Sequence, residues 1–298
     1  MATVQVTKVE SDKLPGLYQA ANQASLEAQS QFFFALALYL ILLVVAAFVS
    51  YMRPNDVTGA LASASLFLIT LGILIFIRLK RPDDIWYNGR AVAESVKTIS
   101  WRWIMRADPY EDCHSYEVIT KQFISDLKSI LEQNKSLSHA LQSPAAAKDA
   151  ISQTMKDVRA SPWDVRLRTY LSERVQDQVE WYFKKSQFNK RRAKQWFWAS
   201  VSLHGVAICL LLYKIKDPTL ALPIEVIATG AGAASTWLQA KKHNELSSAY
   251  ALTAHEITLI KGESDSVHSE SELSEYVVNS EAAFSREHTQ WIARKGDS

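Results

Sequence analysis

The chain has 298 residues, of which 48% are hydrophobic and 21% charged, and its formal net charge is +2. The two cysteines, Cys113 and Cys209, lie far apart, so a disulfide framework is not expected. The seven histidines show no metal-binding spacing, and neither a cofactor nor a nucleic-acid partner is expected. The apolar residues are instead concentrated in long runs, which predict an all-α membrane protein in contact with a lipid bilayer.

Four apolar runs are long enough to be candidate membrane spans. They cover about residues 32–52, 59–79, 196–213 and 219–238. A helix needs about 20 residues to cross the hydrocarbon core, so the sequence predicts four transmembrane helices. His204 and Glu225 interrupt the third and fourth runs, and a buried soluble hairpin is the alternative for that pair. The aromatic residues Trp196, Trp198 and Trp237 favour the membrane, because such rings prefer its interface.

The short segments RPNDVT and KIKDP connect the runs within each pair, which predicts two tandem helical hairpins. Lysines and arginines gather at the opposite ends of the spans, around residues 78–81, 184–194 and 241–242. By the positive-inside rule those ends are cytoplasmic. We therefore expect a multi-pass protein of the inner membrane, with both termini inside and both hairpin tips outside.

The segments outside the runs predict a helical cytoplasmic module. After Pro82, with Asp83 as the expected cap, one helix is predicted up to Pro109. Further amphipathic helices are predicted over 116–133, from Ser161 into the third span, over 243–262 and over 271–295. In the helix that follows Pro82, Arg90 and Glu94 share a face. That face is expected to pack against the helix that leads into the third span.

The two halves of the chain have the same organisation when the second is placed on the first with an offset of about 162 residues. Each half contains a lead-in helix, a span, a short outer loop, a second span and an amphipathic helix. Each half enters and leaves the membrane on the same side, so the repeat is parallel. This disfavours the transporters built on inverted repeats, although a carrier with parallel repeats stays open.

The sequence contains no constellation typical of an enzyme, such as GxSxG, a Walker loop or GxGxxG, and no enzymatic activity is expected. A basic cluster precedes the third span and consists of Lys190, Arg191, Arg192 and Lys194. It is interpreted as a positive-inside anchor in contact with anionic lipid. A phosphate-binding cluster is the alternative.

Ionisable residues within the predicted spans carry more functional information. Such a group costs a few kcal/mol in the bilayer, so it usually faces water or a partner. The candidate pore-lining residues are Glu225, Thr229, Gly232 and Thr236, which follow one another at helical spacing, together with His204. A close helix–helix contact through the small residues, with Glu225 reaching the headgroups, is the alternative.

Three segments carry a resemblance to a known family. These are IWYNGRAVAESVKTISWRWIMRADPY after the first pair of spans, the lead-in segment RTYLSERVQDQVEWYFKKSQFNKRRAKQWFW, and AAFSREHTQWIARK near the end. They resemble the SLATT superfamily of bacterial two-transmembrane effector domains. The residues Trp86, Tyr87, Arg90, Glu94 and Trp101 follow the second span in the order of the first motif. The chain resembles two tandem units, residues 1–140 and 141–298.

The resemblance implies a membrane effector that forms a pore in bacterial, anti-phage defence and acts with a cytoplasmic nucleotide-signalling or sensor protein. It agrees with the polar stripe at Glu225, and a pore built from so few polar residues is expected to require a homo-oligomer. The alternative is a membrane-anchored sensor or scaffold without a pore. The size of the predicted cytoplasmic part favours it, because about 115 residues lie between the two hairpins alone.

Overall fold

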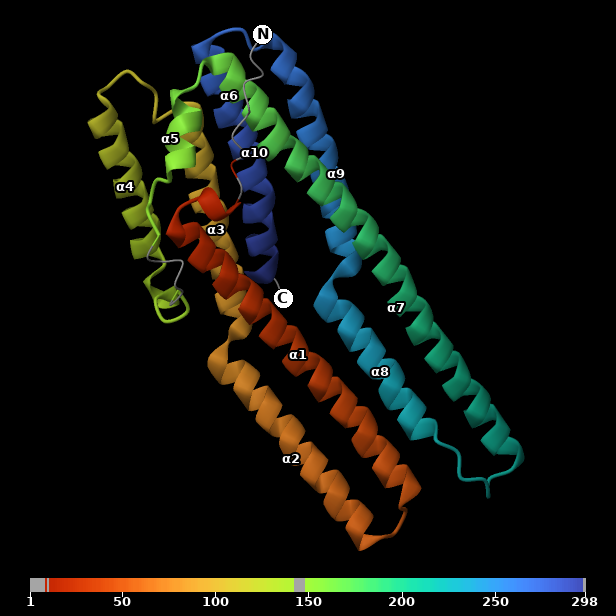
Figure 1. Ribbon diagram of the computed structural model, residues 1–298. Coiled ribbons are helices and arrows are strands. Elements are labelled where there is room, and N and C mark those ends of the chain that lie inside the picture. Colours follow the sequence, from red (N-terminus) through yellow and green to blue (C-terminus); the bar gives the residue numbers. More distant parts are fainter. Residues whose placement is uncertain (1–8, 10, 142–147, 297–298) are drawn as a thin grey trace. The chain divides into compact units, whose positions relative to one another are not determined.

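The computed structural model describes residue 9 and residues 11–141 and 148–296, with side chains as far as Ser285. Within these ranges the chain is helical and contains no strand (Figure 1). The long helices are α1 (Gly16–Met52), α2 (Val57–Lys80), α3 (Pro82–Met105), α4 (Tyr116–Gln133), α7 (Gln176–Lys216), α8 (Ile224–Lys241), α9 (His243–Glu263) and α10 (Glu270–Gly296). The short ones are η1 (Ser11–Lys13), η2 (Lys135–Leu137), α5 (Gln153–Ala160), α6 (Trp163–Tyr170), a π-helical turn η4 (Leu171–Val175) and η5 (Ser264–Ser266).

The chain divides into two compact units. The first, here called the core unit, comprises residues 1–28, 83–184 and 249–298, and the second, the apolar unit, comprises residues 29–82 and 185–248. The core unit holds the hydrophobic core, in which Trp101, Trp103, Phe123 and Tyr170 are fully buried. This unit contains α3–α6, α10 and the adjoining ends of α1, α7 and α9.

The apolar unit exposes large hydrophobic side chains along its helices, including Phe67, Leu68, Ile208 and Leu212. Three stretches within the described residues are long and apolar enough to cross a membrane, namely Gly16–Met52, Val57–Met105 and Trp163–Lys216. They include the first three predicted spans. The fourth predicted span, residues 219–238, overlaps α8 but begins too early, because residues 219–223 are not helical and α8 starts after Pro223. It is not among the three stretches, because Glu225 and several small residues lower its hydropathy.

The predicted helices after the spans agree closely with the observed ones. The helix predicted over 116–133 is α4, and those predicted over 243–262 and 271–295 are α9 and α10. The lead-in helix continues into the third span as predicted, but the π turn Leu171–Val175 interrupts its regular hydrogen bonding. The sequence analysis did not identify α5, and it placed the cap of α3 at Asp83, whereas α3 already begins at Pro82.

Equivalent hydrogen bonds recur in the two halves of the chain. The Ser25 hydroxyl donates to the Trp86 carbonyl oxygen at 2.9 Å. The Ser186 hydroxyl donates to the Ser247 carbonyl oxygen, also at 2.9 Å. Ser186 and Ser247 each lie 161 positions after their counterparts in the first half. In both halves the helix that enters an apolar pair is therefore joined in the same way to the helix that follows the pair.

The turns between the apolar helices repeat with the same offset. The Asp56 side chain accepts hydrogen bonds from the Thr58 backbone N–H at 3.1 Å and from its hydroxyl at 2.6 Å. The Asp217 side chain accepts the same pair from Thr219, at 3.2 and 2.6 Å. This arrangement is an Asx turn, which a short polar side chain stabilises locally. The duplication thus extends to individual side chains, with an offset of 161 that agrees with the predicted value of about 162.

Candidate functional sites

The polar stripe on α8 faces away from the other helices of the apolar unit. Glu225, Gly232 and Thr236 are exposed, and Thr229 is half-buried. The Thr229 hydroxyl donates to the Glu225 carbonyl oxygen at 2.7 Å, which satisfies it within the helix. Apart from the backbone of α8 itself, no atom of the described residues lies within 4 Å of a Cβ built on Gly232. The opposite face of α8 buries Ile224, Ala231 and Ala234, so packing fixes the direction in which the stripe points.

His204 on α7 is also exposed, and its Nδ1 lies 2.8 Å from the Ser200 carbonyl oxygen one turn earlier. The side of α7 that contacts α8 is marked instead by Ser200, whose hydroxyl lies 2.8 Å from that of Ser235. The structure therefore places His204 on the outside of the apolar unit. Among the described residues, no hydrogen bond or ion pair joins His204 to the α8 stripe.

Aromatic side chains surround the end of α8 nearest to α9. The Trp237 ring lies 6.0 Å from the rings of both Phe33 and Trp196. The Lys241 ammonium lies 3.2 Å from the centre of the Phe33 ring and 4.9 Å from that of Trp237. Tryptophan rings and a lysine together are typical of the boundary between the hydrocarbon core and the headgroups.

The predicted face of α3 lies in the core unit. The Arg90 and Glu94 side chains form an ion pair at 2.7 Å and are partly buried, with 34% and 20% of their surfaces exposed. The Arg90 guanidinium lies 6.0 Å from the Trp181 ring, and the Trp101 ring lies 5.6 Å from that of Tyr170. Burial opposes the charge on Arg90, but Glu94 and nearby tyrosines outweigh it and raise the pKa of Arg90. Trp86 and Tyr87 are half-buried neighbours whose rings are 4.7 Å apart.

A fully buried ion pair, absent from the sequence-based candidates, joins α10 to the π turn. The Arg174 Nε and Nη2 atoms donate to the two Glu281 carboxylate oxygens at 2.8 and 2.7 Å. The Tyr170 hydroxyl and the Thr98 hydroxyl donate to the same carboxylate at 3.0 and 2.9 Å. Burial disfavours the charge on Arg174, but Glu281 outweighs it and raises the pKa of Arg174. Glu281 thus ties three segments of the core unit together.

Two further buried arginines hold the end of α3. Arg159 donates to the carbonyl oxygens of Trp103 and Tyr110, the latter at 2.9 Å. Arg166 donates to the Met105 carbonyl oxygen and pairs with Glu270. The last carbonyl groups of a helix lack partners within it, so cationic side chains stabilise them. The sequence offered one signal for these contacts, which is the presence of three arginines, Arg159, Arg166 and Arg168, around the predicted helix start at Ser161.

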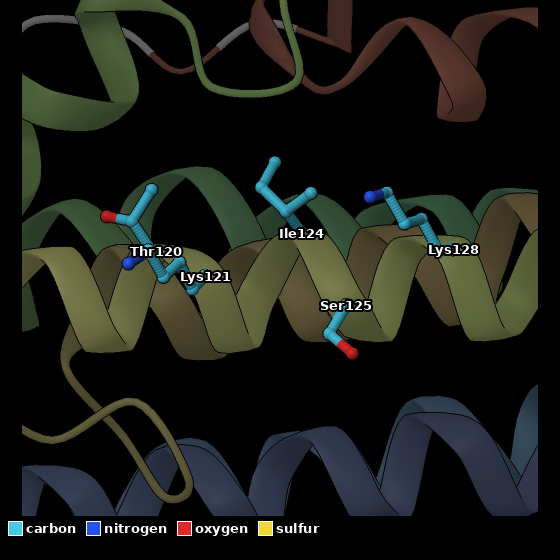
Figure 2. Close-up of a pocket in the computed structure, with 5 residues that line it drawn as sticks. All are labelled: Thr120, Lys121, Ile124, Ser125 and Lys128. Atoms are coloured by element: carbon cyan, nitrogen blue, oxygen red, sulfur yellow. The ribbon is translucent and has the colours of Figure 1, made fainter.

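The basic cluster Lys190, Arg191, Arg192 and Lys194 is exposed on α7. A different surface feature is a shallow hollow of about 250 Å³ along α4. Its lining residues are Thr120, Lys121, Ile124, Ser125 and Lys128, and Figure 2 shows that Ser125 points to the other side of the helix from Thr120 and Ile124. Because these side chains do not converge, the hollow is not treated as a ligand site.

Comparison with known families identifies the class of protein. Residues 15–167 match the SMODS and SLOG-associating 2TM effector domain 3, SLATT_3. Residues 170–291 match the SMODS and SLOG-associating 2TM effector domain 1, SLATT_1. The fold and candidate spans are those of a helical membrane protein, and the chain belongs to the SLATT effector family as two tandem units. The first match extends beyond residue 140. No curated protein and no solved structure matches the chain.

Proposed function

We propose that the chain crosses the inner membrane four times, as two tandem helical hairpins with their tips outside and both termini in the cytoplasm. The Asx turns at Asp56 and Asp217 support equivalent roles for the two tips. The equivalence of α8 with α2 supports a fourth span despite the modest hydropathy of α8. The lysines and arginines around residues 78–81, 184–194 and 241–242 support the orientation.

We further propose that several copies assemble into a pore lined by the α8 stripe. The outward direction of Glu225, Gly232 and Thr236 carries this proposal. A carboxylate facing hydrocarbon costs a few kcal/mol, so a second copy or water has to cover it. Copies related by a symmetry axis near this stripe would place a ring of carboxylates around an aqueous path. Such rings favour cations.

In this proposal the core unit receives the signal, and the protein has no catalytic activity of its own. Family membership supports a membrane effector that acts in bacterial, anti-phage defence with a nucleotide-signalling or sensor protein as its cytoplasmic partner. The π turn near Arg174 lies in the continuous helix that leads from the core unit to the third span. π turns are rare, but they occur mostly inside α-helices and frequently at functional sites.

The test is ion flux through liposomes that contain the purified full-length protein, with the parent compared to Glu225→Gln and Glu225→Asp. The parent should conduct with a preference for cations. Glu225→Gln should lose that preference, and Glu225→Asp, which keeps the charge, should retain it. Mass measurement in nanodiscs should show an oligomer. A conducting Glu225→Gln variant with unchanged ion preference would show that the stripe does not line the path.

The second candidate is a membrane-anchored sensor or scaffold. The four hydrogen bonds to Glu281 favour it, because they make the core unit rigid enough to present a fixed binding surface. A monomer in nanodiscs, together with the absence of flux, would support this alternative.

A further inference from the structure

The segment of α7 that leads into the third predicted span carries a high density of positive charge. The basic surface of α7 consists of Lys190, Arg191, Arg192 and Lys194, all of which are exposed. Lys184 is not included, because it pairs with Glu180 at 3.1 Å. No acidic residue occurs between Glu180 and Asp217. The sequence therefore supplies no local carboxylate to neutralise this surface.

Polar contacts on the other side of α7 fix the direction of the basic surface. The Ser186 hydroxyl donates to the Ser247 carbonyl oxygen at 2.9 Å, and the Ser247 hydroxyl donates back to the Ser186 carbonyl oxygen at 3.1 Å. One turn further on, the buried His243 ring lies 2.7 Å from the Asn189 side-chain oxygen. These residues hold one edge of α7 against α9, so the cations extend away from the packed edge.

Exposed aromatic rings accompany the cations. Phe188, Phe197 and Trp198 are 49%, 52% and 55% exposed. The Arg192 guanidinium lies 5.4 Å from the centre of the Phe188 ring. The same helix continues into one of the three apolar stretches that can cross a membrane. Cations interleaved with aromatic rings at the end of a span are placed at the level of lipid headgroups.

The first half of the chain has no equivalent of this surface. With the offset of 161, the counterparts of Lys190, Arg191 and Arg192 are Gln29, Ser30 and Gln31. The packing is retained, because Ser25 and Ala28 are buried like their counterparts Ser186 and Asn189. The same helical arrangement therefore forms with neutral side chains at these positions. A structural requirement common to both halves does not explain the charge in the second.

We propose that the basic surface of α7 is a binding site for anionic phospholipids, whose phosphate groups it holds at the membrane surface. Phosphate diesters carry one negative charge and accept hydrogen bonds from lysine and arginine. The acyl chains of the same lipids lie against Phe197 and Trp198. The leaflet that supplies the lipid is the cytoplasmic one if the proposed orientation is correct. The binding itself depends neither on that orientation nor on the existence of a pore.

The experiment measures lipid binding to the purified full-length protein in neutral detergent, by native mass spectrometry and by titration with phosphatidylglycerol or phosphatidylcholine. The test variant is K190Q/R191S/R192Q, which transfers the neutral residues of the first half to the second. The charge-conserving control is K190R/R191K/R192K. A matched surface control is K121Q/K128Q, which removes two exposed lysines from α4.

The parent should bind phosphatidylglycerol at least tenfold more tightly than phosphatidylcholine, and salt should weaken the binding. The K190Q/R191S/R192Q variant should lose tenfold or more of this affinity, whereas both controls should keep it. If that variant does not accumulate, the single substitutions R191S and R192Q should each weaken binding about threefold. Equal binding of the two lipids by the parent would overturn the proposal, and so would unchanged binding by the neutral variants. Equally tight binding of the soluble headgroup glycerophosphoglycerol would show a site for a free anion instead.

Discussion

Arg81 and Lys242 occupy equivalent positions in the two halves of the chain and share a left-handed backbone conformation, with φ angles of 45° and 47°. Arg81 ends α2 and Lys242 ends α8, so each separates an apolar helix from the helix that follows it. They lie 161 positions apart. A left-handed residue at the end of a helix is usually glycine, because a side chain costs about 1–2 kcal/mol there. Both halves thus end the second apolar helix in the same way, with a residue whose side chain makes the left-handed conformation unfavourable.

We expect R81G and K242G to raise the free energy of unfolding by up to about 1 kcal/mol each, because glycine adopts the left-handed conformation without strain. K80G, one position earlier in α2, should lower it by about 1 kcal/mol, since glycine is unfavourable within a helix. Thermal unfolding in detergent measures these changes. If R81G and K80G lowered the free energy of unfolding by the same amount, the left-handed conformation of Arg81 would not determine the effect of glycine.

Gly89 permits the close approach of α3 to α1. A Cβ at Gly89 would lie 3.2 Å from the Ala21 carbonyl oxygen and 3.3 Å from the Ser25 backbone nitrogen, atoms that cannot move independently. We expect G89A to destabilise the core unit by about 1–3 kcal/mol through overpacking. Around Gly262 in α9, no described atom outside the backbone of that helix lies within 4 Å of such a Cβ. G262A should instead be neutral or stabilising, by up to about 1 kcal/mol. A comparison of the two melting temperatures checks this contrast.

Glu281 is a fully buried carboxylate that accepts four hydrogen bonds within the core unit. We expect Glu281→Gln to lower the stability by about 3–5 kcal/mol, because it leaves the Arg174 charge buried without its partner. The double variant R174M/E281M removes both charges and should recover much of the loss. Chemical denaturation, followed by tryptophan fluorescence, measures both. If the double variant is as unstable as the single one, the hydrogen bonds to Tyr170 and Thr98 contribute more than the ion pair.

The sequence predicted the helices more completely than the sites. The patterns at residues 116–133 and 243–262 gave nearly correct boundaries because apolar periodicity determines which face of a helix is buried. The contacts of Arg159, Arg166 and Arg174 could not be predicted, since each depends on which distant carbonyl group or carboxylate the fold brings close. The exposed direction of Glu225 was equally unpredictable, because spacing defines a stripe but not what the stripe faces.

The orientation can be tested by cysteine labelling of intact cells. In a background with C113S and C209S, a cysteine at Asn55 or Asp217 should react with a membrane-impermeant thiol reagent, because we place both turns outside. A cysteine at Ser125, which is exposed on α4, should react only after the membrane is permeabilised. Ser143, which the sequence also predicts to be cytoplasmic, lies outside the described residues. Labelling at Ser125 in intact cells would reverse the proposed orientation.

The contact between α7 and α9 should weaken in mild acid. His243 is buried, and its ring lies 2.7 Å from the Asn189 oxygen. Burial lowers the pKa of His243 below its usual value of 6.5, and the nearby cations Lys241 and Arg192 lower it further. The unfolded chain therefore takes up a proton at a higher pH than the folded chain. The stabilisation is complete above about pH 6.5 and decreases as the pH falls below it.

The melting temperature of the parent should accordingly fall between pH 7.5 and 5.5, and that of H243Q should show a smaller change over the same interval. An identical pH dependence in the parent and in H243Q would show that protonation of this residue is not linked to folding.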